Sequence, residues 1–134
     1  MPIARDPNVL GQEFYDAIVP LSASATGTAG LFTAPRAFRI DSVEVFSDTT
    51  IASSGANYFT FNLRVGGRSC GTFTINGNAI TAGTSAVFTP LAETGQAPIS
   101  NRVAAKGELV DCVLTLTGAL TINVRLVVHG RYVG

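Results

Sequence analysis

Apolar and polar side chains alternate along most of the segment from Lys106 to Gly134. The apolar even-numbered positions are Val110, Cys112, Leu114, Leu116, Leu120, Ile122, Val124, Leu126 and Val128. The positions between them are mostly polar. A repeat of two places alternate side chains on the same face of a strand, so this segment is predicted to form half-buried strands rather than helices.

We predict that these strands pair as a β-hairpin whose register is set by the buried face. A two-residue turn at residues 118–119 would pair apolar with polar side chains along the whole ladder. A three-residue loop at 117–119 pairs apolar with apolar, and a one-residue slip would turn every side chain to the other face. The predicted inward pairs are Leu116–Leu120, Leu114–Ile122, Cys112–Val124 and Val110–Leu126. On the outer face, this register predicts an ion pair between Asp111 and Arg125.

The remaining sequence contains further strand signals. Residues 14–21 are predicted to form a strand ended by Pro20, and residues 22–30 a flexible loop rich in Ser, Ala, Thr and Gly. Within 36–47 the apolar phase changes near residues 41–42, which indicates a β-bulge. Residues 57–65 alternate cleanly, with Phe59, Phe61, Leu63 and Val65 on the inward side. Further short strands are expected at 69–75 and 85–89.

Eight or so short strands separated by turn signals predict an all-β protein, an antiparallel β-sandwich of which the jelly roll, with two packed sheets of four, fits best. Residues 1–14 contain Pro2, Pro7 and Gly11 and follow neither repeat. They are predicted to be an extended N-terminal arm. Residues 15–134 are then the β-sandwich domain.

Composition narrows the classes of function. Only 13% of the residues are charged and the formal net charge is zero, against a usual charged fraction of about 25%. Nucleic-acid binding favours a basic patch, so we expect no nucleic-acid partner. No apolar run is long enough to span a membrane, and the N-terminus has no signal-peptide pattern, so we expect a protein made in a cytoplasm. A neutral, charge-poor surface favours a protein that works inside an assembly.

The candidate chemical residues each have a simpler structural interpretation. His129 is the single histidine, so a multi-histidine metal site is excluded. Cys112 falls on the buried phase and His129 on the outward phase, which disfavours a nucleophile–base pair. Cys70 and Cys112 lack zinc-ligand spacing, although a disulfide between them stays open. Asp41 and Glu44 lack the pattern of a calcium loop or a glycosidase pair. We therefore predict no enzyme activity, no cofactor and no metal.

An apolar cluster is predicted on the outward face of the hairpin. Leu109 and Val127 pair there, Val113 lies two same-face steps (four residues) beyond Leu109, and Arg125 is on the same face. An exposed apolar cluster often marks a partner surface, with a covering loop of the same chain as the alternative. We predict that Leu109, Val113, Arg125 and Val127 form a subunit interface.

Two stretches resemble small structural proteins of tailed bacteriophages. They are residues 31–43, Leu-Phe-Thr-Ala-Pro-Arg-Ala-Phe-Arg-Ile-Asp-Ser-Val, and residues 103–109, Val-Ala-Ala-Lys-Gly-Glu-Leu. Together with the arm, they are similar to capsid decoration (cement) proteins with a jelly-roll fold. The resemblance implies a homotrimer on the capsid exterior that bridges neighbouring capsomers and binds the major capsid protein. The predicted arm contacts are Pro2, Ile3, Arg5, Val9, Leu10 and Phe14.

A second class of function fits the same fold. β-Sandwich lectins and phage tail or receptor-binding proteins present aromatic and polar side chains to glycans. Here tryptophan is absent, and Tyr15, Tyr58 and Tyr132 are the remaining tyrosine candidates. Glycan binding is therefore the alternative to the virion structural role.

Overall fold

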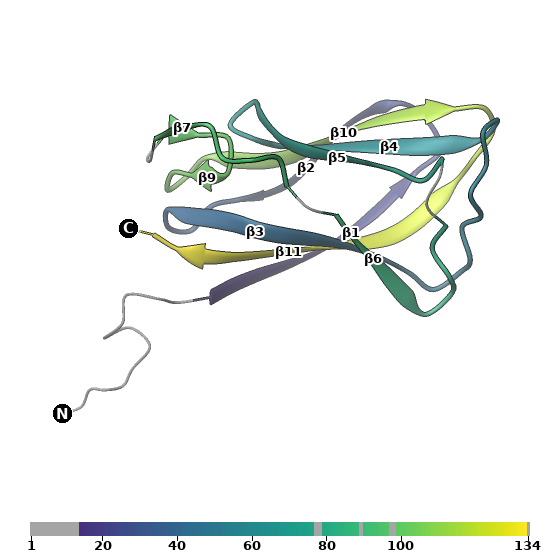
Figure 1. Cartoon of the computed structure of the whole chain (residues 1–134), viewed down its shortest axis with the longest axis horizontal. Coiled ribbons are helices and arrows are strands. Elements are labelled where there is room, and N and C mark those ends of the chain that lie inside the picture. The colour runs from purple at the N-terminus through teal and green to yellow at the C-terminus, as the bar shows by residue number, and fades with distance from the viewer. Residues whose placement is uncertain (1–13, 77–78, 89, 97–98, 134) are drawn as a thin grey trace.

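The computed structural model describes residues 14–76, 79–88, 90–96 and 99–133, and these form two antiparallel sheets packed face to face (Figure 1). No helix occurs within these ranges, which confirms the predicted all-β sandwich. The strands are β1 (Phe14–Ala23), β2 (Gly27–Thr33), β3 (Phe38–Ser47), β4 (Tyr58–Val65), β5 (Arg68–Thr74), β6 (Thr84–Phe88), β7 (Gly95–Gln96), β8 (Ile99–Ser100), β9 (Val103–Ala104), β10 (Leu109–Thr117) and β11 (Ile122–Tyr132).

The eight long strands have the order of a jelly roll. One sheet runs β1-β11-β3-β6 and the other β2-β10-β4-β5, with β9 added to the end of β3 and β7–β8 forming a small separate hairpin. The pairs are nested: β4 with β5, β3 with β6, β2 with β10, and β1 with β11. A long antiparallel ribbon rolled into two sheets gives this nesting, which defines the jelly roll.

The predicted β10–β11 hairpin is wrong. β10 pairs with β2 and β4, whereas β11 pairs with β1 and β3, so the two strands lie in opposite sheets. Their apolar faces still meet, but across the core of the sandwich. The predicted ion pair is wrong for the same reason: Asp111 binds Arg64 through two hydrogen bonds of 2.9 and 2.7 Å, and Arg125 binds Asp48 at 3.1 Å.

Two further boundaries differ from the sequence prediction. Pro20 does not end the first strand, which continues to Ala23. A proline is tolerated there because β1 lies at the edge of its sheet. Most of the predicted loop 22–30 is strand, since β2 begins at Gly27 and pairs with β10. Small residues with weak strand propensity form this edge because the β10 ladder supplies their backbone partners.

The predicted bulge in β3 is confirmed. Ser42 pairs with His129 and Ile40 with Gly130, so Asp41 is the extra residue. Phe38 and Ile40 before the bulge and Val43 and Val45 after it are therefore all buried, although their sequence phase changes. Arg131 holds the bulge through hydrogen bonds of 2.9 and 3.1 Å to the Asp41 carboxylate.

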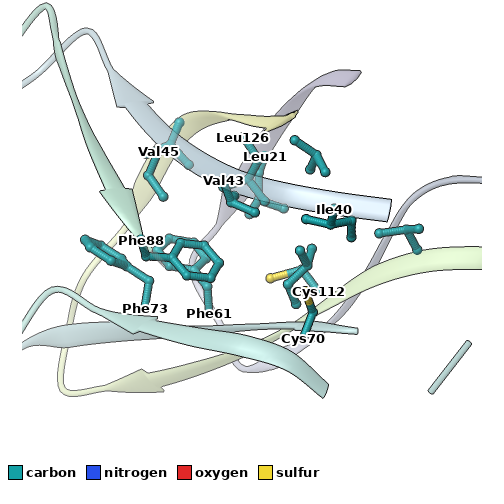
Figure 2. Close-up of a cluster of buried hydrophobic side chains, with 14 of the residues drawn as sticks. Leu21, Ile40, Val43, Val45, Phe61, Cys70, Phe73, Phe88, Cys112 and Leu126 are labelled. Atoms are coloured by element: carbon teal, nitrogen blue, oxygen red, sulfur yellow. The ribbon is translucent and has the colours of Figure 1, made fainter. Parts of the chain in front are cut away.

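The core lies between the two sheets, as Figure 2 shows. Leu21, Val43, Val45 and Leu126 from one sheet face residues of the other. The predicted inward side of β4 is confirmed, since Phe59, Phe61, Leu63 and Val65 are all buried. Phe61 also packs on Phe73, with ring centroids 6.1 Å apart.

Cys70 and Cys112 are both free and buried in this core. They lie on β5 and β10, which flank β4. Two strand spacings separate their Cα atoms by about 9.6 Å, whereas a disulfide requires less than about 7 Å. The open question about a disulfide is thereby answered: the backbone positions do not permit one.

Residues 1–13 of the predicted arm lie outside the described residues, and Phe14 is the first residue of β1.

Candidate functional site

The outward side of the β1-β11-β3-β6 sheet, here called the outer β11 face, is the strongest candidate site. Residues directly opposite one another in a ladder share a face. The strand registers therefore arrange its side chains in rows across the sheet. The first row contains Asp16, His129 and Ser42; the central row contains Ile18, Val127, Glu44 and Val87; and the third row contains Pro20, Arg125, Phe46 and Ser85.

The central row is largely apolar and uncovered. Ile18 is 66% exposed and Val87 61% exposed, and Val127 between them is half-buried. Glu44 is the polar member of the row. Single exposed apolar side chains are common on protein surfaces, whereas apolar side chains grouped on one uncovered face often mark a site of protein contact. This row is therefore the part of the face where we expect another protein surface to bind.

A shallow hollow adjoins the row. It has a volume of about 190 Å³ and is lined by Ile18, Phe46, Arg125 and Val127. The Arg125 guanidinium lies 5.4 Å from the centre of the Phe46 ring and donates to Asp48. Small-molecule sites usually measure about 300–1,000 Å³. This hollow is thus large enough for one apolar side chain of a protein partner.

His129 connects three strands beside the row. Its Nδ1 lies 2.8 Å from Asp16 on β1, and its Nε2 lies 2.5 Å from Glu44 on β3. The hydrogen bond with Glu44, followed by that with Asp16, raises the pKa of His129 despite partial desolvation. The same contact lowers the pKa of Glu44. Ser85 on β6 donates to Glu44 at 2.8 Å. The hydroxyl therefore bonds a carboxylate rather than the imidazole, which is not the arrangement of an activated serine.

The outer face of the other sheet has a different character. Its contacts are polar: Arg64 with Asp111, Thr60 with Thr74 at 3.1 Å, and Ser69 with Asn62 at 2.7 Å. These side chains satisfy one another, which leaves fewer groups for a partner. The two faces of the sandwich are thus chemically distinct.

The predicted interface residues are divided between these two faces. Leu109 and Val113 lie on β10, and Arg125 and Val127 lie on β11, so the predicted pairing of Leu109 with Val127 is wrong. Leu109 is 46% exposed near the end of β10. Val127 and Arg125 belong to the outer β11 face. Ile18, Phe46 and Val87 were not predicted as interface residues; the available signal was an apolar residue on the outward phase of each strand.

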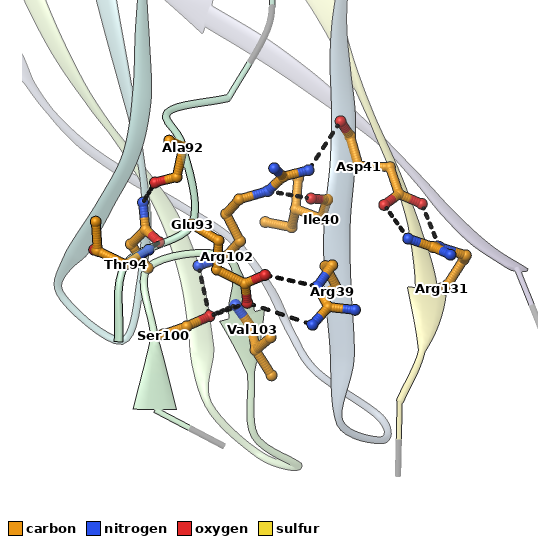
Figure 3. A network of polar contacts seen from close by, with 11 residues as sticks. Arg39, Ile40, Asp41, Ala92, Glu93, Thr94, Ser100, Arg102, Val103 and Arg131 are labelled. Carbon is orange, nitrogen blue, oxygen red and sulfur yellow. Dashed lines mark hydrogen bonds and ion pairs between the residues drawn. The ribbon is translucent and has the colours of Figure 1, made fainter. Parts of the chain in front are cut away.

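The loop before β10 contains a second polar network (Figure 3). Arg39 donates to Glu93 at 3.1 Å, Ser100 donates to Glu93 at 2.7 Å, and Arg102 donates to the Ile40 carbonyl at 3.0 Å. A nearby hollow of about 600 Å³ is lined partly by Arg68, whose guanidinium is held by Glu108 and by two backbone carbonyls. These groups bind one another and fasten the loop to the sandwich.

The two cysteines and the histidine singled out in the sequence lie apart in the structure. Cys112 is in the core and His129 on the outer β11 face, as predicted. Burial raises the pKa of Cys70 to about 11 and that of Cys112 to about 12. Among the described residues, no cluster of three metal-ligating side chains is found. Within the same ranges, no helix has the length and apolar character needed to cross a membrane.

Comparison with known proteins gives distant similarities. No protein-family model and no curated protein matches the chain. Among solved structures, it is similar to a chain of infectious bursal disease virus strain Gx, with 14% identity, a TM-score of 0.44, and coverage of 92% of this chain and 32% of that one. A second similarity is to the T13 particle of the same virus, with 14% identity, a TM-score of 0.28, and coverage of 90% and 39%. The chain thus spans between about a third and two fifths of the length of the structures it matches.

Proposed function

We propose that this chain is a non-enzymatic structural component of a virus particle and acts by binding other protein subunits. The observation that carries the proposal is a jelly-roll strand order with an uncovered apolar row on one sheet face. Jelly rolls form many capsid domains, although the fold alone does not decide function. The apolar row adds a specific reason to expect a protein partner. The low charge content of the chain is compatible with close packing between subunits.

The finer form of the proposal follows the resemblance to phage decoration proteins. The N-terminal segment, including Ile3, Val9 and Leu10, binds the major capsid protein on the capsid exterior and bridges neighbouring capsomers. The expected homotrimer used a β10–β11 hairpin face, and these two strands lie in opposite sheets. The number of copies is therefore a separate question from attachment to a shell.

Truncation of the N-terminal segment tests attachment. A variant lacking residues 1–13 keeps Phe14, which pairs with Arg131. We expect it to retain the circular dichroism and mass of the full chain but to lose co-sedimentation with capsids that lack the native protein. The matched control, Leu91→Ala, changes an exposed side chain outside both candidate regions. Full binding by the truncated chain would contradict the arm as the attachment element.

Glycan recognition is the competing function for a jelly roll. A glycan array with the full-length protein separates the two. Selective binding to one glycan class, together with no co-sedimentation with capsids, would replace the structural role by a receptor-binding one.

A further inference from the structure

The two most exposed apolar side chains of the central row lie at its opposite ends. Ile18 is on β1, at one edge of the sheet, and Val87 is on β6, at the other. Between them the order is Val127 on β11 and Glu44 on β3. Reversing this row brings apolar ends together, because Ile18 then lies over Val87 and Val87 over Ile18. The two ends of this row are thus complementary to those of a reversed copy.

We propose that a second copy of this chain packs on the outer β11 face, related by a two-fold axis that runs parallel to the strands between β11 and β3. Such an axis exchanges β1 with β6 and β11 with β3. Two-fold contacts use the same patch on both subunits, and sheets packed face to face keep their strands nearly aligned. Ile18 of one copy then contacts Val87 of the other, and this contact occurs twice.

The Arg125 guanidinium supports this arrangement. The axis places Arg125 over Phe46 of the second copy, extending the stacking that it makes with its own Phe46. It places Val127 over Glu44, whose carboxylate is already held by His129 and Ser85. No two like charges meet along these two rows. The zero formal net charge of the chain also removes long-range repulsion between copies.

The size of the face places this contact at the small end of the range for specific interfaces. β1, β3 and β11 are 10, 10 and 11 residues long, and β6 adds 5 more. At usual strand dimensions, this is on the order of 550 Å² of flat area. Protruding side chains give such a face more accessible surface than its flat area, and a stable interface needs about 800 Å² per partner. The inference names a copy-to-copy contact, and it holds or fails independently of attachment to a capsid.

Cysteine cross-linking between different variants tests the geometry. Ile18→Cys and Val87→Cys proteins are prepared separately. Each variant alone, and a mixture of the two, is treated with a thiol cross-linker. The cross-linker is shorter than the distance between positions 18 and 87 across one sheet, which is three strand spacings or about 14 Å. We expect a cross-linked dimer when the two variants are mixed and little product from either one alone. The native thiols Cys70 and Cys112 are fully buried and do not compete. A mixture of Leu109→Cys with Val87→Cys is the control, because Leu109 belongs to the other sheet.

Solution mass provides the second measurement. Light scattering of the unmodified chain should give a dimer, and the combination Ile18→Asp with Val87→Asp should raise the dimer dissociation constant at least tenfold with unchanged circular dichroism. Equal cross-linking of Ile18→Cys alone would overturn the two-fold axis. A monomer at high concentration, or a trimer that resists the Asp substitutions, would overturn the interface. Either result would leave the co-sedimentation test of the proposed function unaffected.

Discussion

At the scale of single residues, the charge of the His129 side chain links three neighbouring strands. Its imidazole joins β11 to Asp16 on β1 and to Glu44 on β3. Arg131 faces the same side two residues further on and is held by Asp41. Both carboxylates at the ring favour the imidazolium, so the protonated form fastens the edge strand β1 to the centre of its sheet.

The first prediction concerns pH. Because the folded state raises the pKa of His129 above its ordinary value of 6.5, its contribution is fully present below pH 6.5 and is lost as the pH rises through the folded-state pKa. The free energy of unfolding should therefore fall over that range in the native chain and stay flatter in His129→Gln. Since the chain has one histidine, its NMR titration is unambiguous. A midpoint below 6.5 would contradict the prediction.

Glu44 determines how the same contact responds to acidic pH. Its pKa is lowered, first by the hydrogen bond with His129 and then by Ser85. Its contribution is present above the ordinary carboxyl pKa and is lost as the pH falls through the lowered value. In Glu44→Gln, the NMR midpoint of His129 should move down, whereas Leu109→Ala should leave it unchanged.

The second prediction concerns Gly130, which lies opposite the bulge. A Cβ at this position would lie 2.8 Å from Cδ2 of Phe38 and would also meet the Arg39 carbonyl oxygen. Crowding of this kind usually costs about 1–3 kcal/mol, so Gly130→Ala should lower the urea midpoint. The matched control is Gly27→Ala on β2, where no atom lies within 4 Å of the new Cβ. Equal stability of the two variants would show that the backbone at Gly130 adjusts freely.

At the scale of elements, the bulge in β3 explains how one strand buries two different phases. Asp41 is the extra residue, so Phe38 and Ile40 reach the same core as Val43 and Val45. In a regular strand with the same sequence, the two halves would face opposite sides. The bulge is thus the structural consequence of a phase change that is visible in the sequence.

The third prediction follows from this geometry. Deletion of Asp41 leaves a regular strand in which all four apolar residues still face inward. The loss of the partly exposed Arg131 contact should cost about 0.2–1 kcal/mol. Deletion of Glu44 also shortens the strand by one residue. If the strand then becomes regular and loses the bulge, Ser42 faces the core and Val43 faces outward. We expect this second deletion to be clearly less stable in urea unfolding. The reverse order of stability would contradict the bulge assignment.

At the scale of the whole molecule, the nested strand pairs bring the most distant parts of the chain together. β1 pairs with β11, so Phe14 lies opposite Arg131, and β2 pairs with β10. Among the long strands that the structure describes, only β4 and β5 form a local hairpin, which turns at Gly66 and Gly67 with positive φ angles of 55° and 85°. The outermost pair, β1 with β11, therefore forms after the inner pairs, or it forms at the cost of a large loss of chain entropy.

The fourth prediction is a slow folding reaction. Proteins dominated by non-local strand pairing fold in milliseconds to seconds. Stopped-flow refolding from urea should therefore resolve the main folding phase. In the same urea experiments, Leu126→Ala should lower the free energy of unfolding by about 2–5 kcal/mol. This substitution truncates a side chain that is only 1% exposed. Folding within microseconds would contradict the nested topology.

The sequence by itself determined the class of fold, most strand positions and the buried residues. Alternation assigns each apolar side chain to a face, and the hydrophobic effect then requires that face to be covered, as it is for Phe59, Leu63, Val124 and Leu126. The phase change in β3 also located the bulge. These are local properties, because they depend on neighbouring residues along one strand.

Only the tertiary structure decided which strand pairs with which. An apolar face on β10 and another on β11 can meet side by side in one hairpin or across the core between two sheets, and alternation is the same in both cases. The structure has the second arrangement, which separates Leu109 from Val127 and gathers Ile18, Val127 and Val87 in one row. The candidate interface could not be predicted from the sequence because its residues come from strands that are adjacent only after the ribbon has rolled.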